Sequence, residues 1–290
     1  MRFAVLFMPT LLMAASGFVV DHATVAGPNL KELRDRLAEA GIPSEYGGPH
    51  ANGATEMAVV SFPDGSYLEL IAIQAGAEAQ VVNANPWSAF LRGNAGPCAW
   101  ARAVEDLGAE TARLRQAGIE TAAPARSGRT RPDGVRLEWE TARVGEGQGT
   151  FFPFLIHDLT PRRLRAFPSG KPSNRDFGGV SRVVIAVRNL DEAVKRYRQA
   201  YGLPGPLKQV DRDFGAQLAL LGGTPVVLAA PLGADSWLRT RLDEFGEAPC
   251  AFVLAARKAG RYPAATRSRW FGADISWFDP DKLGWQLGFE

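Results

Sequence analysis

The feature of this chain that most constrains its fold is a repeated pattern in which a short apolar strand is followed by an amphipathic helix. The pattern recurs about every 80 residues. The strands of its first three copies cover residues 18–25, 97–104 and 180–187. Asn29, Asp106 and Asn189 follow these strands and are typical N-cap residues of the predicted helices. A fourth apolar strand, residues 249–254, is followed by too little chain of helical character for a full helix.

Further strand signals follow each predicted helix. In the first copy they cover residues 55–62 and 67–73, and in the second copy 135–144 and 151–156. The unit is therefore β-α-β-β-β, and four copies predict an α+β protein of two domains with two units each. The segment 167–175 is rich in turn formers and charge, so we expect the domains to cover 18–166 and 176–290.

Composition is that of a globular protein, with 46% hydrophobic residues, 22% charged residues and a net charge of +2. Basic runs occur, for example at 126–131 and 257–269, but neither a basic face with stacking aromatics nor a known nucleic-acid motif is evident. We interpret them as solvated surface and expect no nucleic-acid partner. The chain is expected to act as a monomer or a homodimer.

The N-terminus resembles an export signal. Arg2 precedes an apolar run at 3–13, and small residues at 14–17 suit signal-peptidase cleavage. We predict a signal peptide at 1–17 and an exported protein; the alternative is a buried extension of a cytoplasmic protein. The run is shorter than the roughly 20 residues that a membrane span requires, so we expect no stable membrane insertion.

A family resemblance rests on three features: the repeated unit, the strand that carries Asp21 and His22, and the segment Phe-Pro-Asp-Gly-Ser-Tyr-Leu-Glu-Leu at 62–70. Together they resemble the vicinal oxygen chelate superfamily, and specifically its glyoxalase-like domains. The resemblance implies that the four units pair into two cup-shaped mixed sheets of the glyoxalase/bleomycin-resistance type. It also implies metal ligands on the first and last strands of a unit, which lie side by side.

Strand alternation tests whether these ligands can point into a cup. Alignment of the caps Asn29 and Asn189 places His22 opposite Arg182, on the face away from the helix. On the last strand of the first copy, Leu68 and Leu70 suit the face covered by the helix, so Glu69 faces the cup as well.

The resemblance then implies that His22 and Glu69 bind one divalent ion. An imidazole and a carboxylate suit Zn, Fe, Mn or Ni. The second copy has Ala99 and Phe154 at the corresponding positions, so a third ligand has to come from elsewhere. His50, in a glycine-rich loop, is one candidate for that ligand.

A bound ion would hold two adjacent oxygens of a small substrate, as the resemblance implies, and would act as a Lewis acid. Glu56, at the start of a strand, is a candidate third ligand or catalytic base, alongside His50 and Glu69. Tyr67 is a candidate hydrogen-bond donor. Isomerase, lyase and ring-cleaving dioxygenase reactions all fit this arrangement.

Two alternatives remain open from the sequence. The protein could be a non-catalytic member of the vicinal oxygen chelate superfamily that sequesters a small molecule without metal, with a cavity in the second half lined by aromatic residues. The second half could instead be purely structural. The residues that suggest a second cavity are Arg182, Trp270, Trp277, Trp285 and Gln286. Cys98 and Cys250 occupy equivalent strands, where we interpret them as small buried residues; whether they pair is open.

Overall fold

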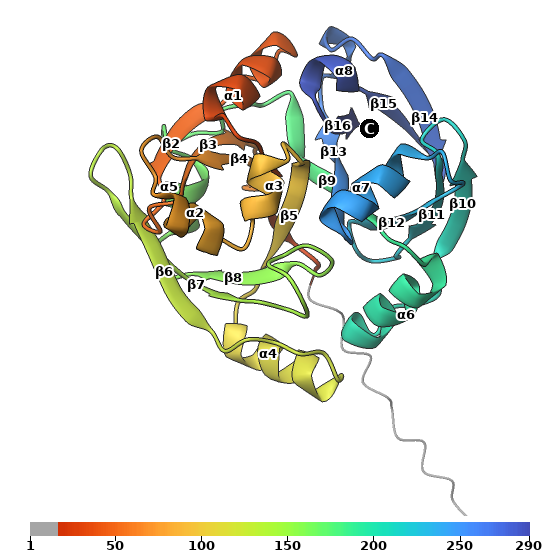
Figure 1. The fold of residues 1–290 in the computed structure, drawn as a ribbon, viewed down its shortest axis with the longest axis horizontal. Coiled ribbons are helices and arrows are strands. Elements are labelled where there is room, and N and C mark those ends of the chain that lie inside the picture. The colour runs from red at the N-terminus through yellow and green to blue at the C-terminus, as the bar shows by residue number, and fades with distance from the viewer. Residues whose placement is uncertain (1–16) are drawn as a thin grey trace, which may run out of the picture.

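The computed structural model describes residues 17–290, and it contains two eight-stranded mixed sheets (Figure 1). The predicted signal peptide lies outside the described residues except for Gly17, so export stays a prediction. The first sheet has the order β2-β3-β4-β1-β5-β8-β7-β6, and the second sheet, β10-β11-β12-β9-β13-β16-β15-β14, repeats that order strand for strand. The predicted fold of paired β-α-β-β-β units is therefore confirmed.

The first half contains eight strands and five helices. Its strands are β1 (Val20–Ala26), β2 (Glu45–Pro49), β3 (Thr55–Ser61), β4 (Tyr67–Ile73), β5 (Gly96–Ala103), β6 (Ala125–Thr130), β7 (Arg136–Ala142) and β8 (Phe154–Asp158). Its helices are α1 (Leu30–Glu39), α2 (Ala79–Ala84), α3 (Ser88–Arg92), α4 (Leu107–Gln116) and α5 (Arg162–Ala166).

The second half has the same plan with a reduced fourth unit. Its strands are β9 (Phe177–Ala186), β10 (Leu207–Asp211), β11 (Ala216–Leu220), β12 (Val226–Pro231), β13 (Ala248–Ala256), β14 (Thr266–Trp270), β15 (Ala273–Trp277) and β16 (Gln286–Phe289). Its helices are α6 (Leu190–Tyr201), α7 (Trp237–Phe245), α8 (Pro280–Leu283) and the single 3₁₀ turn η1 (Ala259–Arg261), which stands where the other units have a full helix.

The long outer helices begin where the sequence predicts. The side chains of Asn29, Asp106 and Asn189 accept hydrogen bonds from backbone N–H groups in the first turns of α1, α4 and α6. Figure 1 shows these three helices on the outside of the sheets, whereas α3 and α7 lie inside the curve of the first and second sheet.

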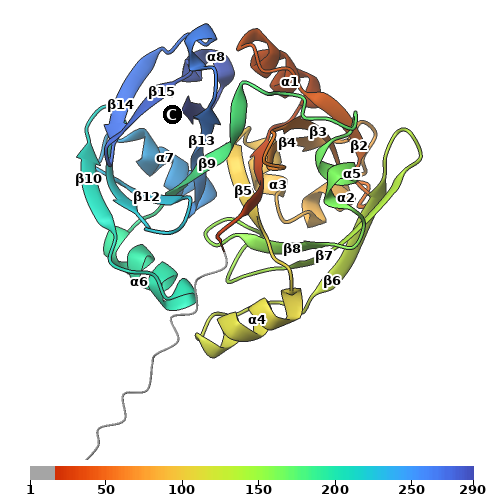
Figure 2. The ribbon, with the colours of Figure 1, turned by 180° about the vertical axis from the view of Figure 1, so that it is seen from behind.

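One apolar core is shared by both halves. It joins the helix-facing sides of the two sheets, with Leu37 and Trp100 from the first half and Tyr197 and Phe289 from the second. Figure 2 shows β5 beside β9 and β13 at this junction, and β5 contacts β13 directly. Arg241 of α7 crosses the junction and donates to the backbone oxygens of Ala95 and Pro249 at 2.7 and 2.6 Å. The two halves are therefore packed together through apolar surface, which is costly to expose.

The cup of the second sheet is filled by its own side chains. Trp270 and Trp277 pack with Phe214 and with residues of α7 in an apolar cluster. Trp285 lies in the shared core, and Arg182 donates to the Glu290 carboxylate at 2.7 Å. The interpretation that these residues line a second cavity is therefore wrong, because tryptophan packing occupies the space.

Cys98 and Cys250 are both buried free cysteines, so the two thiols do not form a disulfide. Burial raises the pKa of both thiols, and that of Cys250 reaches about 12. Within residues 17–290 no helix has the length and hydrophobicity of a membrane span.

Candidate metal centre in the first cup

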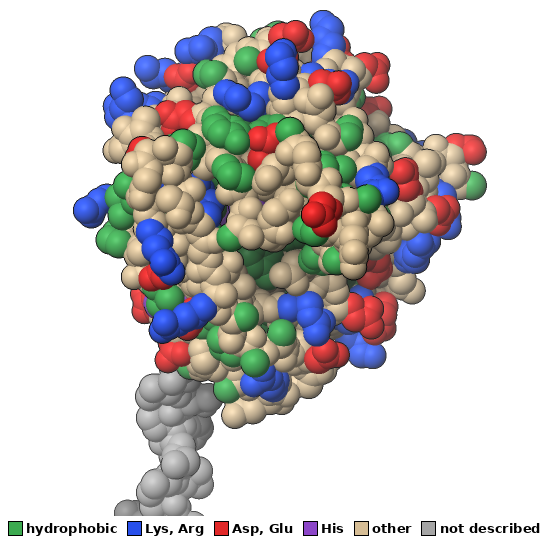
Figure 3. Space-filling view, turned by 60° about the vertical axis from the view of Figure 1, so that its left-hand side comes forward, with side chains coloured by type: hydrophobic (Ala, Val, Ile, Leu, Met, Phe, Trp, Pro, Cys, Tyr) green, Lys and Arg blue, Asp and Glu red, His purple; other side chains and the backbone are tan. Residues whose placement is uncertain are grey.

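The cup of the first sheet remains open and encloses a cavity of about 240 Å³. Its walls come from both units of the first half and from the segment that joins them, and they include Trp87, Trp139 and Phe154. Figure 3, which brings the first half forward, shows a surface hollowed near its middle and acidic and basic side chains interspersed around it. Because the charge on this face is mixed, it lacks the uniform positive potential that attracts a polyanion, and the face suits a small ligand better.

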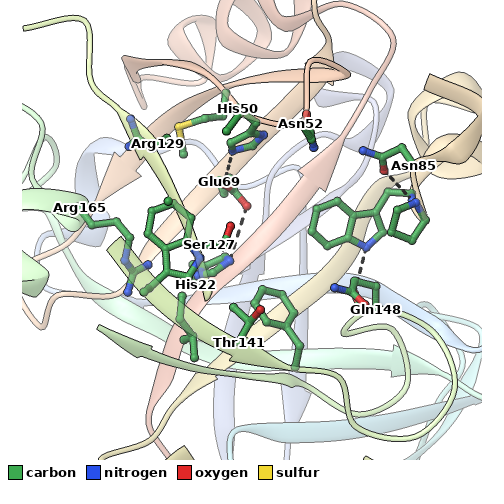
Figure 4. A pocket seen from close by; sticks show the side chains of 18 of the residues that line it. His22, His50, Asn52, Glu69, Asn85, Ser127, Arg129, Thr141, Gln148 and Arg165 are labelled. Carbon is green, nitrogen blue, oxygen red and sulfur yellow. Dashed lines mark hydrogen bonds and ion pairs between the residues drawn. The ribbon is translucent and has the colours of Figure 1, made fainter. Parts of the chain in front are cut away.

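His22 and Glu69 meet inside this cavity, as strand alternation predicts. In the parallel pairing of β1 with β4, His22 lies opposite Tyr67, and Thr24 lies opposite Glu69. The Nε2 atom of His22 is 3.6 Å from Oε2 of Glu69 (Figure 4). Both side chains are buried, with 5% and 9% of their surface exposed.

A carboxylate behind His22 fixes the tautomer of the imidazole. Nδ1 of His22 lies 2.5 Å from Oδ1 of Asp21, which is fully buried. Because an ionised carboxylate can only accept, Nδ1 carries the proton and the Nε2 lone pair faces the cavity. Burial lowers the pKa of His22 to about 4, although the nearby Glu69 charge opposes that shift. The ring is therefore neutral at pH 7, which is the form that binds metals.

Asp21 is in turn held by two arginines of a distant segment, the buried Arg165 and the half-buried Arg162. Arg165 donates to both carboxylate oxygens of Asp21 at 2.8 Å and to both oxygens of Asp158 at 2.7 and 2.8 Å. Arg162 also forms an ion pair with Asp21. This network orients His22 from behind, in the way that outer-shell groups orient metal-binding histidines.

His50 reaches Glu69 from the loop between β2 and β3. Its Nε2 atom lies 3.5 Å from Oε1 of Glu69. Its Nδ1 atom lies 2.7 Å from Oγ1 of Thr55, and the Asn52 side chain accepts from the backbone N–H groups of Ala54 and Thr55. The loop thus holds His50 so that the imidazole faces the cavity.

Glu69 stays ionised in spite of its burial. Burial would raise its pKa, but the hydrogen bond with His50 and the charges of His22, His50 and Arg129 lower it to about 2. Thr24 donates to Oε2 at 3.3 Å. The carboxylate is therefore available as an anionic ligand at the centre of the two imidazoles.

Of the two predicted catalytic side chains, the structure brings only Tyr67 to the cavity. Its ring stacks on His22 at a centroid distance of 4.9 Å, and its hydroxyl accepts from Arg165 at 2.6 Å. Burial raises the pKa of Tyr67 to about 12, so the hydroxyl keeps a proton to donate. Glu56 lies outside, because it alternates with the cavity-lining Met57 on β3, and it accepts from Tyr46 Oη at 3.0 Å.

The second unit supplies no corresponding ligands. Thr24 lies opposite Ala99 and His22 opposite Ala101 in the β1–β5 pair, and Ala101 lies opposite Phe154 in the β5–β8 pair. The pseudo-twofold relation therefore places Ala99 and Phe154 at the positions of His22 and Glu69, as predicted. The Phe154 ring meets the His22 ring edge-on at 5.4 Å.

Within residues 17–290 no group of three or more His, Cys, Asp or Glu side chains is arranged to hold a metal ion, but two imidazoles and a carboxylate are donors that suit a divalent ion. His22 and His50 lie 3.6 and 3.5 Å from opposite oxygens of Glu69. His22, His50 and Glu69 are therefore the residues that would hold such an ion.

Sequence reasoning missed the residues that support this centre. Asp21 is adjacent to His22 in sequence, and that adjacency was a usable signal for a carboxylate–histidine pair. Arg165 carried no such signal, since it lies far along the chain from Asp21.

Comparisons with known proteins agree with the fold. A family model described as a glyoxalase-like domain matches residues 20–201. A hypothetical protein from Staphylococcus aureus is 12% identical, with a TM-score of 0.65 over 93% of this chain and 98% of that chain. A mutant of 4-hydroxymandelate synthase from Streptomyces coelicolor is 13% identical, with a TM-score of 0.61 over 94% and 92%. No curated protein matches the chain.

Methylmalonyl-CoA epimerase from Mycobacterium tuberculosis is similar to a smaller part of the molecule. It is 21% identical over 39% of this chain and 87% of that chain, with a TM-score of 0.35.

Proposed function

Because the chain belongs to the glyoxalase-like domain family, within the vicinal oxygen chelate superfamily, we propose that its first half is a divalent-metal-dependent enzyme. The substrate is a small molecule that offers two adjacent oxygens, and the reaction is an isomerisation, a lyase reaction or a dioxygenation. The observation that carries the proposal is the meeting of His22, His50 and Glu69 in one cavity.

The three residues hold the ion, which is expected to be Zn, Fe, Mn or Ni. When bound, such an ion supplies Lewis acidity toward oxygens of the substrate. His22 contributes a neutral Nε2 donor that is oriented by Asp21, and Glu69 contributes negative charge. Two imidazoles and one carboxylate leave coordination positions for substrate oxygens.

The remaining side chains of the cavity position the substrate and move protons. Tyr67 donates a hydrogen bond to a developing oxyanion of the substrate, and Arg165 fixes the position of the Tyr67 hydroxyl by donating to its oxygen. Trp87, Trp139 and Phe154 supply apolar wall that excludes water. Trp87 is fixed in turn by donating Nε1–H to the backbone oxygen of Gln148 at 3.0 Å.

Metal analysis tests this proposal directly. Protein purified without chelators should hold about one equivalent of metal, and His22→Ala and Glu69→Gln should each lose it. Glu56→Gln is the matched control, because Glu56 lies in the same unit but outside the cavity. Loaded protein should then be screened with dicarbonyl substrates and, with an oxygen electrode, with catechol-like substrates. Absence of metal after incubation with Zn, Mn, Fe and Ni would refute the enzyme mechanism.

A metal-free protein that sequesters a small molecule is the second candidate. Ala99 and Phe154, at the positions equivalent to His22 and Glu69, favour it, because half of the possible ligand set is replaced by apolar side chains. In that case a ligand should raise the melting temperature of both the wild type and Glu69→Gln without any metal requirement.

We also propose that the protein is exported. The proposal rests on Arg2, the apolar run at 3–13 and the small residues at 14–17. Phe18, which follows the expected cleavage site, packs on Trp100 and Tyr201 at centroid distances of 5.8 and 5.1 Å. N-terminal sequencing of the mature protein tests this: a sequence starting near Phe18 is expected, and one starting at Met1 would contradict it.

A further inference from the structure

Arg129 is a buried cation that the proposed metal centre does not use. It lies on β6, with only 5% of its surface exposed. In the antiparallel pair β6–β7, Arg129 lies opposite Leu137, and Ser127, two residues earlier, lies opposite Trp139. Ser127 and Trp139 both line the cavity. Since opposed residues two apart point to the same face, the side chain of Arg129 faces the cup. Arg129 accordingly contributes to the wall of the cavity (Figure 4).

The guanidinium of Arg129 is only partly satisfied. One terminal nitrogen, Nη1, donates to the backbone oxygen of Gly47 on β2. The other, Nη2, is buried and has no hydrogen-bond partner among residues 17–290. Over the same residues, no carboxylate lies within the 4.0 Å that defines an ion pair with this side chain.

The other charged groups of the cavity are already engaged. Arg165 is bound by Asp21 and Asp158. Glu69 receives Thr24 and faces His22 and His50, so its charge is directed to the proposed ion. Arg129 is therefore the cavity cation that has no ion pair within the described part of the chain.

A buried guanidinium without an anion is unfavourable, and folded proteins normally pair such charges. Arginine also has the planar fork that matches a carboxylate with two hydrogen bonds. Within residues 17–290, Glu69 is the one carboxylate that lines the cavity, and a divalent ion would add further positive charge there. Both facts call for a ligand that brings its own negative charge.

We propose that Arg129 binds a carboxylate of the substrate, so that the substrate is a small organic acid rather than a neutral molecule. This assignment rests on the cavity being the ligand site of the proposed function, but it does not require the metal. The cavity volume of about 240 Å³ equals about eight waters at roughly 30 Å³ each, which limits the ligand to a small molecule. The aromatic wall of Trp87, Trp139 and Phe154 favours a planar, unsaturated acid.

Calorimetric titration with two probes of one shape tests the assignment. The probes are 2-hydroxybenzoate, which carries a carboxylate beside a second oxygen, and its neutral amide, 2-hydroxybenzamide. Metal-stripped and Zn-loaded full-length protein are titrated separately. Wild-type protein should bind the acid at least about tenfold more tightly than the amide in both forms, because a hydrogen-bonded charge pair is lost with the amide.

Two substitutions on the same strand separate recognition from net charge. Arg129→Gln should abolish the preference for the acid. Arg126→Gln removes the same charge from an exposed side chain, which is 80% exposed and paired with Glu140, and should keep the preference. Arg129→Lys, which retains the charge, should keep part of it and covers the case in which Arg129→Gln does not fold.

The assignment is overturned if wild-type protein binds neither probe, if it binds the acid and the amide equally, or if Arg129→Gln keeps the preference. These outcomes are distinct from failure of the metal proposal. Protein that binds no metal but prefers the acid through Arg129 refutes only the metal centre. Protein that loads metal and shows no preference refutes only the role of Arg129.

Discussion

Replacing Asp21 by asparagine perturbs both the stability of the first half and its candidate metal centre. Asp21 is fully buried, receives two hydrogen bonds of 2.8 Å from Arg165, and faces Nδ1 of His22 at 2.5 Å. Asparagine keeps the shape but removes the charge that balances buried guanidinium. Loss of one partner from a buried ion pair costs about 3–5 kcal/mol. Because Asp158 still pairs with Arg165, we expect the lower end of that range.

Urea denaturation followed by circular dichroism measures the free energy of unfolding of Asp21→Asn. Its affinity for Zn should also fall about 10- to 100-fold, because the tautomer of His22 is no longer fixed. Asp35→Asn is the control: Asp35 forms an exposed pair with Lys31, and its loss should cost below about 1 kcal/mol. The reasoning is refuted if Asp21→Asn unfolds within about 1 kcal/mol of the wild type and binds Zn with unchanged affinity.

Three further predictions concern stability. The folded-state pKa of His22 is about 4 against an ordinary 6.5, and that of Glu69 is about 2 against 4.5, so protonation of either group is less favourable in the folded metal-free protein than in the unfolded chain. Stability should fall as the pH drops from 6.5 toward 4, because the folded state resists protonation of His22, and should fall further from pH 4.5 toward 2, because it resists protonation of Glu69. Each stage amounts to roughly 3 kcal/mol. A urea midpoint that is constant between pH 7 and 4 would contradict this, and His22→Gln should remove the stage between pH 6.5 and 4. Gly96→Ala should cost about 2–4 kcal/mol, because Gly96 has φ of 65° and an added Cβ would collide with Trp285 across the junction of the halves. Gly223→Ala is the control: Gly223 has φ of 79° but no neighbouring atom near an added Cβ, so the change should cost only about 1–2 kcal/mol. Urea denaturation of both variants measures the two free energies of unfolding. The first half expressed alone should be insoluble, since the shared core would be exposed; a soluble, cooperatively folded half would show that the halves are independent.

The fold and part of the site were accessible from local patterns. Helix caps such as Asn29 act within one turn, and strand alternation is a property of a few consecutive residues. These local rules correctly placed His22 and Glu69 on one face of the first sheet. They also placed Ala99 and Phe154 at the equivalent positions of the second unit.

The conformation of loops and edges was not accessible in the same way. His50 was a candidate because of its residue type, but its approach to Glu69 depends on the turn that Asn52 and Thr55 stabilise. Glu56 was an equally reasonable candidate, and the register of β3 turned it toward Tyr46 instead. A shift of a single residue in register reverses the face of every side chain in a strand, so strand ends are poorly determined by sequence pattern.

The sequence by itself determined the repeat, the order of elements within each unit and the inward face of the first and last strands, because all three follow from short-range periodicity. Only the tertiary structure decided which cup stays open. In the second half Trp270 and Trp277 fill the space, and in the first half Arg165 reaches back 144 residues to hold Asp21 behind His22. How side chains fill a cavity and how buried charges are balanced both depend on contacts between residues that are far apart in the sequence. Such contacts cannot be predicted from a pattern of a few consecutive residues.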